Sequence, residues 1–142
     1  MNDNVFLRLY KVIFILAALW NICVGATGLL FQNYSIQLFY GSSALHETFI
    51  AMLNYRIVML AIIIFGLGYF IVSRAPLLNR GIIWLGLLSK LILFCIFTFH
   101  FFTGNTTIFA FLLVCGDMAW SLIFLYFLFK SSHHVKYNFL TG

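Results

Sequence analysis

Charge is what this chain has least of. Only 8% of its 142 residues are Asp, Glu, Lys or Arg, whereas about 25% is usual for a soluble domain. Hydrophobic residues make up 64%, against about 45–50% in soluble domains. No polar stretch is long enough to form a separate soluble domain. We therefore expect residues 1–142 to form a single integral membrane domain, in contact with the lipid bilayer.

Cysteine and proline are also scarce. The three cysteines, Cys23, Cys95 and Cys115, all fall inside apolar runs and form neither a CxxC motif nor a metal-ligand spacing. We expect them to be buried and chemically inert. The one proline, Pro76, lies in the segment Arg74–Arg80. Because proline disfavours helix in the residue before it, this segment is expected to be a turn.

Four apolar runs remain, and each reaches the roughly 20 residues needed to cross a bilayer core. They predict an all-α, four-helix transmembrane bundle with helices at about 7–31, 44–73, 81–102 and 107–129. The first run also has the features of a cleavable signal peptide. A retained helix is favoured because the run is long and carries Asn21 at its centre.

The longest polar connection joins the first two runs. Its segment Ser35–Tyr40 alternates polar and apolar residues and includes two aromatic residues. Aromatic residues are enriched at membrane interfaces, so a surface loop is expected here. Ser43 is expected to cap the next helix, with Glu47 in its first turn.

Basic residues mark one side of the predicted bundle. The connections 32–47 and 103–106 contain no Lys or Arg. The basic residues of the other side are Arg8, Lys11, Arg74, Arg80, Lys130 and Lys136. The positive-inside rule then places both termini in the cytoplasm. It also accounts for the net charge of +5 without a nucleic-acid partner.

Two charges lie near the middle of the last two runs. Lys90 and Asp117 are about 14 and about 13 residues from the centre of the intervening turn, so in a helical hairpin their depths differ by a few ångströms. A lone charge at the bilayer centre costs about 2.5–3.5 kcal/mol, and a pair that meets costs less. We expect a buried Lys90–Asp117 ion pair at the midplane.

Other residues join this predicted polar site. Asn21 lies at nearly the same depth, and Arg56 is somewhat nearer the outer face. Together the three charged residues sum to +1. This excess charge can be relieved in three ways: Arg56 can extend to the headgroups, Lys90 can lose its proton, or an anionic ligand or lipid headgroup can bind. Arg56 could instead turn inward toward Glu47 or Asp117. Supporting positions are Gly25 on the small face Ala17–Asn21–Gly25–Gly28, Gly86 one turn before Lys90, and Trp120 and Ser121 on the face of Asp117.

Two functions fit this polar layer. In the first, the chain is a non-enzymatic inner-membrane protein whose Lys–Asp pair organises the bundle, within a homo-oligomer or as an accessory subunit. In the second, the layer is the site of a small-solute, proton or lipid transporter or channel component. A hydrated cavity that reaches Lys90 favours the second function, and a dry, fully paired layer favours the first.

The sequence shows no arrangement typical of an enzyme. Ser89 and Lys90 are adjacent, so on a helix their side chains point about 100° apart and form no dyad. His100 and Asp117 differ too much in depth for a catalytic triad. His46 and Glu47 lack further metal ligands, and no HExxH motif or phosphate-binding glycine loop is present. We expect no catalytic residue, metal or cofactor.

A resemblance covers about residues 12–129. It is carried by Trp20-Asn21 with Gly25, Gly66-Leu67-Gly68-Tyr69 before Arg74-Ala75-Pro76, Gly86-Leu87-Leu88-Ser89-Lys90, and Gly116-Asp117 with Trp120. In these residues the chain resembles a group of small, uncharacterised four-helix membrane proteins of bacteria. The resemblance implies a multi-pass protein of the bacterial inner membrane and no particular reaction. The chain is also similar in size and helix count to the DoxX-like proteins, but it shares no motif with them.

Overall fold

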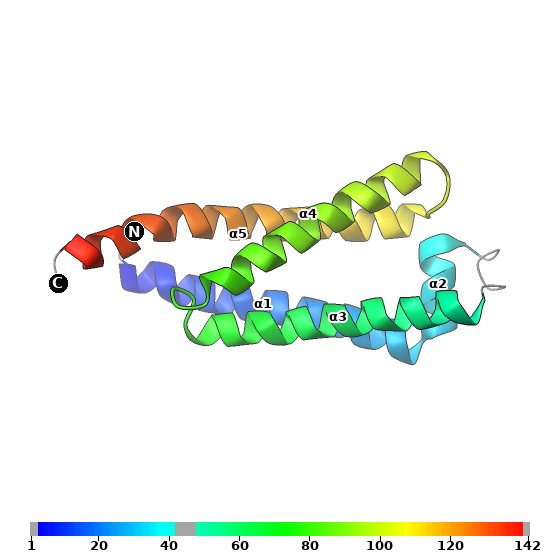
Figure 1. Cartoon of the computed structure of the whole chain (residues 1–142), viewed down its shortest axis with the longest axis horizontal. Helices are drawn as coiled ribbons and strands as arrows, with labels where there is room; N and C mark the ends of the chain where they lie inside the picture. The colour runs from blue at the N-terminus through cyan, green and yellow to red at the C-terminus, as the bar shows by residue number, and fades with distance from the viewer. Residues whose placement is uncertain (1–2, 42–47, 141–142) are drawn as a thin grey trace.

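The computed structural model describes residues 3–41 and 48–140, and within them all regular structure is helical (Figure 1). The helices are α1 (Asp3–Leu30), α2 (Gln32–Tyr40), α3 (Phe49–Arg74), α4 (Arg80–Phe102) and α5 (Ile108–Leu140). By length and composition α1, α3, α4 and α5 are each able to cross a membrane. The expectation of an all-α fold with four such helices is confirmed.

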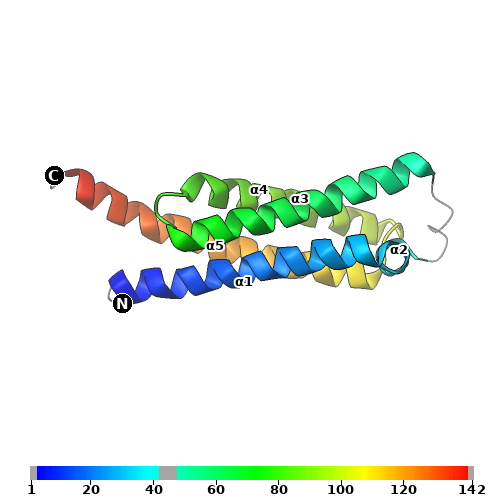
Figure 2. The same ribbon diagram turned by 90° about the horizontal axis from the view of Figure 1, so that it is seen from below.

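The four long helices form two pairs. Helix α1 packs along α3 and α4 packs along α5, as both ribbon views show (Figures 1 and 2). Glycines allow the first pair to approach closely. A Cβ atom added at Gly25 would lie 2.6 Å from Cγ1 of Ile63, and one added at Gly66 would lie 3.0 Å from the carbonyl oxygen of Ala18. The face of α1 that the sequence marked by small residues is therefore the face that packs on α3.

Aromatic rings join the two pairs at one end of the molecule. The ring of Phe14 on α1 lies 5.3 Å from that of Phe124 on α5, and the ring of Tyr10 lies 4.8 Å from that of Phe127. We call this region the closed half. Its buried members are Phe6, Tyr10, Phe14, Ala17, Ala18, Tyr69, Val72, Ile83, Leu87, Phe124, Phe127 and Leu128. The start of α1, the end of α5 and the α3–α4 turn lie at this end (Figure 1).

The predicted surface loop after the first helix is wrong. Residues 32–40 form the short helix α2, which buries Ser35, Ile36 and Phe39. The backbone N–H of Thr107 donates to the carbonyl of Phe39 over 2.9 Å, and its hydroxyl donates to the carbonyl of Leu38. The apolar positions are thus spaced for a helix, and α2 is held against the start of α5.

Three helix boundaries also differ from the prediction, and α1 begins at Asp3 rather than near residue 7. Helix α3 begins at Phe49, where the hydroxyl of Thr48 accepts from the N–H of Ala51 over 3.4 Å. The predicted cap Ser43, together with His46 and Glu47, lies outside the described residues. Helix α5 continues past Phe129 to Leu140, because no glycine or proline interrupts the chain there.

The predicted burial of the cysteines is wrong for two of the three. Cys23 and Cys95 are exposed on the protein surface, and Cys115 is half-buried. The sequence misleads here because the lipid-facing side of a membrane helix is as apolar as its packed side. An apolar run therefore does not indicate which of its residues contact other helices.

Candidate functional site

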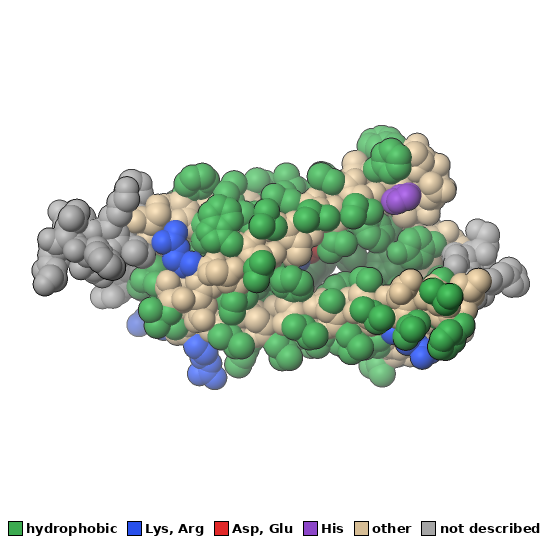
Figure 3. All heavy atoms as spheres, viewed as in Figure 1, with side chains coloured by type: hydrophobic (Ala, Val, Ile, Leu, Met, Phe, Trp, Pro, Cys, Tyr) green, Lys and Arg blue, Asp and Glu red, His purple; other side chains and the backbone are tan. Residues whose placement is uncertain are grey.

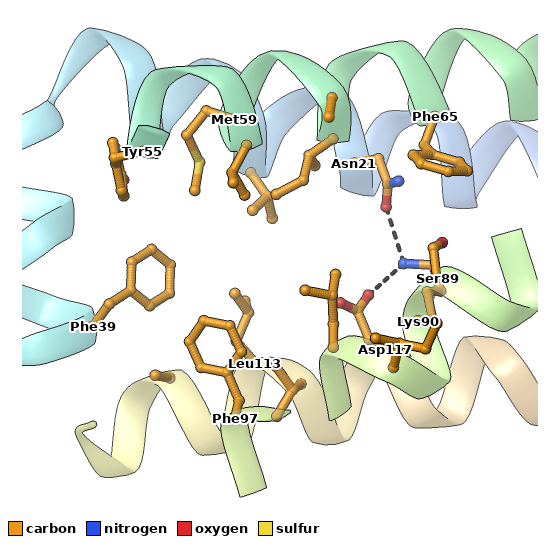
Figure 4. A pocket seen from close by; sticks show the side chains of 18 of the residues that line it. Asn21, Phe39, Tyr55, Met59, Phe65, Ser89, Lys90, Phe97, Leu113 and Asp117 are labelled. Carbon is orange, nitrogen blue, oxygen red and sulfur yellow. Dashed lines mark hydrogen bonds and ion pairs between the residues drawn. The ribbon is translucent and has the colours of Figure 1, made fainter. Parts of the chain in front are cut away.

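The predicted ion pair is present, and a third helix contributes to it. The Nζ atom of Lys90 on α4 pairs with the carboxylate of Asp117 on α5. The same Nζ atom donates to Oδ1 of Asn21 on α1 over 3.2 Å (Figure 4). Lys90 is only 4% exposed. The three side chains, here called the polar cluster, therefore connect the α1–α3 pair to the α4–α5 pair.

A tyrosine that the sequence analysis missed lies beside the polar cluster. Tyr69 of α3 is fully buried, and the Nζ atom of Lys90 lies 6.0 Å from the centre of its ring. Gly86 makes room for this ring, since a Cβ atom there would lie 2.6 Å from Cε1 of Tyr69. Among the described residues the Tyr69 hydroxyl has no hydrogen-bond partner. Gly86 signalled a close contact, but its sequence position does not reveal which ring would fill it.

The other predicted supporting residues make contacts within or between helices and do not bond to the side chains of the polar cluster. The Ser121 hydroxyl donates to the backbone carbonyl of Asp117 over 3.0 Å and does not reach its carboxylate. Trp120 packs against the closed half, with its ring 6.3 Å from that of Phe124. Gly25 contacts α3, as described above.

The structure does not bring Arg56 into the polar cluster. Its Nε donates to Oε1 of Gln32 over 2.7 Å at an exposed position. The Nε2 of Gln32 in turn contacts Sδ of Met52 over 3.0 Å. Arg56 is drawn to this partner because α2, absent from the prediction, brings Gln32 close to the start of α3. The excess charge of +1 predicted for the polar layer therefore does not arise.

A cavity of about 740 Å³ opens beside the polar cluster. The polar cluster and Ser89 lie at one end, and Phe39 and Tyr55 lie at the other (Figure 4). All five helices contribute to the wall, which is mostly apolar but also includes the polar side chain of Asn54 on α3 and the ring of Tyr40 on α2. Further apolar members are Trp20, Val24, Ile36, Ala51, Met52, Val58, Met59, Ala61, Ile62, Phe65, Tyr69, Ile92, Leu93, Phe97, Ala110, Leu113 and Val114.

The cavity opens sideways, between α3 and α4. These helices diverge from their shared turn (Figure 1). Val58 and Ala61 on α3 and Ile92 on α4 line the cavity and are themselves exposed, so they form its rim. The space-filling view shows the surface hollowed here, with an acidic side chain visible at the bottom (Figure 3). In a membrane-spanning arrangement this opening faces the lipid.

The cavity stops at the closed half. Tyr69 both lines the cavity and belongs to the aromatic cluster beyond it. Phe14 and Phe124, in that cluster, are fully buried. The described residues therefore form a pocket that is closed beyond Tyr69, and not a pore along the bundle axis.

No group of three or more His, Cys, Asp or Glu residues in the described ranges is placed to hold a metal ion. No protein-family model matches the chain, and no curated protein or solved structure shows significant similarity to it. The geometry of the polar cluster and its cavity is therefore the basis for assigning a function.

Proposed function

We propose that this chain is a non-enzymatic, multi-pass membrane protein that binds an amphipathic molecule from the bilayer. The observation that carries the proposal is the position of the polar cluster, which forms one end of a mostly apolar cavity open toward the side. A chain or ring from the membrane fits the apolar walls, and its polar group fits the cluster.

The size and composition of the cavity support binding. Small-molecule sites have volumes of about 300–1,000 Å³, apolar walls and a few convergent polar groups, and the cavity of about 740 Å³ meets these criteria. Binding is favoured over conduction because Tyr69 and the aromatic cluster close the far side. Transport would require the closed half to open.

The polar cluster also supports an organising role. Lys90 contacts side chains from both helix pairs, so it fixes the depth at which the pairs meet. Membership of a homo-oligomer or of a larger membrane assembly, with this chain as an accessory subunit, remains part of the proposal.

The proposed location is the bacterial inner membrane, with both termini in the cytoplasm. Three basic residues lie at the closed half. Arg74 and Arg80 flank the α3–α4 turn, and Nζ of Lys130 lies 5.4 Å from the ring of Phe6 near the start of α1. Basic residues are enriched on the cytoplasmic side. A reporter enzyme that works only in the cytoplasm should be active when it is fused after Gly142. Activity of a reporter that works only in the periplasm would contradict this orientation.

The binding proposal is tested with a probe that has a chain but no headgroup. Trp20 lines the cavity, whereas Trp84 is exposed on α4 and Trp120 packs in the closed half. The variant Trp84→Phe/Trp120→Phe keeps Trp20 as its one tryptophan. Because Trp20 is also 38% exposed, collisions with probe in the bilayer add a linear component, and binding in the cavity is read from the saturable component. In phosphatidylcholine vesicles, a brominated 16-carbon alkane should quench Trp20 fluorescence in a saturable manner.

Two variants with the same increase in side-chain volume distinguish probe binding in the cavity from probe contact with the lipid-facing surface. Ala61→Phe fills part of the cavity rim and should abolish the saturable quenching. Ala119→Phe adds the same ring at an exposed position of α5 that does not line the cavity, and should leave quenching unchanged. Quenching that rises linearly with probe in all variants would reflect collisions in the bilayer and would refute binding.

A further inference from the structure

The polar cluster carries no net charge. Lys90 and Asp117 are the only charged side chains among the described residues that line the cavity. Their formal charges cancel, and they would still cancel if a proton moved from the ammonium to the carboxylate. The neutrality of the site therefore holds for either distribution of that proton.

The polar cluster has unused hydrogen-bonding capacity of both kinds. An ammonium group has three donors, and Nζ of Lys90 uses two of them, on Asn21 and Asp117. The amide nitrogen of Asn21 and the second carboxylate oxygen of Asp117 make no hydrogen bond to the described residues. Asn21 and Asp117 both line the cavity, and Figure 4 shows their side chains on either side of the Lys90 nitrogen. The site thus offers donors and an acceptor within a small space.

We infer that the cavity selects an uncharged amphipath whose head both donates and accepts hydrogen bonds, as a hydroxyl group does. This inference rests on the proposed function. A hydroxyl donates to Asp117 and accepts from Asn21. A carboxylate or phosphate would lie beside the Asp117 carboxylate, whose charge is already balanced by Lys90, and an ammonium would lie beside Lys90. Either would add an uncompensated charge to an apolar cavity.

The dimensions of the cavity favour one chain rather than two. Its lining residues on α3 run from Ala51 to Tyr69, a length of about 27 Å at about 1.5 Å per residue. A volume of about 740 Å³ corresponds to roughly 25 water-sized groups. A chain of roughly 16 carbons with a small head occupies fewer groups than this, whereas a two-chain phospholipid occupies more.

Headgroup selection is tested with three probes that share one chain. Each carries the same brominated 16-carbon chain and ends in a primary alcohol, a carboxylate or a trimethylammonium group. The full-length Trp84→Phe/Trp120→Phe protein is placed in phosphatidylcholine vesicles, and quenching of Trp20 is followed against the mole fraction of each probe. Ala61→Phe and Ala119→Phe serve again as the cavity-filling variant and its control.

The alcohol should reach half-saturation at a mole fraction at least about tenfold lower than either charged probe. Equal or tighter binding of the carboxylate or the ammonium would overturn the inference while leaving the proposed function in place. If neither the alkane nor any of the three probes gives saturable quenching, the proposed function itself fails.

A charge-changing variant tests the reason for the selection. Asp117→Asn keeps the shape of the side chain but leaves Lys90 as the one charged group of the cavity. The carboxylate probe should then bind more tightly than the alcohol. An unchanged order of the three probes would show that charge does not set the preference. If this variant fails to fold, the order measured in the parent protein still decides the inference.

Discussion

The same four long helices build the closed half and, together with α2, the cavity wall, yet the closed half is filled and the cavity is hollow. In the closed half, α5 contributes the rings of Phe124 and Phe127 toward α1. Beside the cavity, the same helix contributes Ala110, Leu113 and Val114. The difference shows that side-chain volume at a few facing positions, together with the divergence of α3 and α4, decides whether the space between two helix pairs is filled.

The polar cluster lies at the boundary between the two regions, and its disruption should have the largest effect. Asp117→Asn leaves the buried Lys90 without its ion-pair partner and should lower the free energy of unfolding by about 3–5 kcal/mol. The double variant Asp117→Asn/Lys90→Met removes both charges and should lose less. Unfolding in mixed micelles of increasing SDS content measures both. A double variant no more stable than the single one would refute the pairing.

Removing one ring from each region compares them directly. Phe127 is fully buried against other rings, so Phe127→Ala should cost about 3–5 kcal/mol. Phe97 borders the cavity and is only partly buried, so Phe97→Ala should cost clearly less than Phe127→Ala, since the side of its ring that faces the cavity has no protein partner. The same SDS titration applies. Equal costs would mean that the cavity is filled by side chains in the membrane.

A glycine substitution tests the contact between α3 and α4 near the closed half. Gly86→Ala places a methyl group against the ring of Tyr69 and should cost about 1–3 kcal/mol by overpacking. Gly81→Ala, on the same helix with open space around it, should be neutral or stabilising by up to about 1 kcal/mol. Thermal unfolding of the two variants side by side gives the difference. A tolerated Gly86→Ala would show that Tyr69 is free to move.

The smallest expected effect concerns the attachment of α2. Thr107→Val removes the hydroxyl that donates to the carbonyl of Leu38 and also accepts from the N–H of Ala110 at the start of α5. The two losses together should cost about 1–2 kcal/mol. Thr106→Val is the matched control, because the Thr106 hydroxyl is buried without a partner among the described residues. It should be neutral or slightly stabilising. Hydrogen exchange of the α2 amides should accelerate only in Thr107→Val; equal exchange in both would exclude this contact as the anchor.

The sequence predicted the polar cluster because depth in a helical hairpin is simple arithmetic. Lys90 and Asp117 lie almost equally far from their connecting turn, and Asn21 lies at a matching height on another helix. Such a depth argument needs neither the angle between helices nor the identity of their contacting faces. It therefore succeeded for the three residues whose positions depend on depth alone.

The same reasoning could not predict what depends on tertiary contacts. Residues 35–40 fit a strand-like alternation and a helical spacing equally well over so short a length, and Thr107, far along the chain, stabilises the helix. Arg56 was misplaced for the same reason, since its partner Gln32 belongs to α2. The cavity depends on how far α3 and α4 diverge, which leaves no periodic signal in the sequence.

An experimentally determined structure in phosphatidylcholine nanodiscs, supplied with the 16-carbon alcohol, tests the central claim most directly. The account predicts elongated density between α3 and α4 that begins within hydrogen-bonding distance of Asn21 and Asp117 and runs toward Phe39, with the Lys90–Asp117 pair intact. The contrary result would be α3 and α4 packed together along their full length, with Phe65 touching Leu93 and no space beside Lys90.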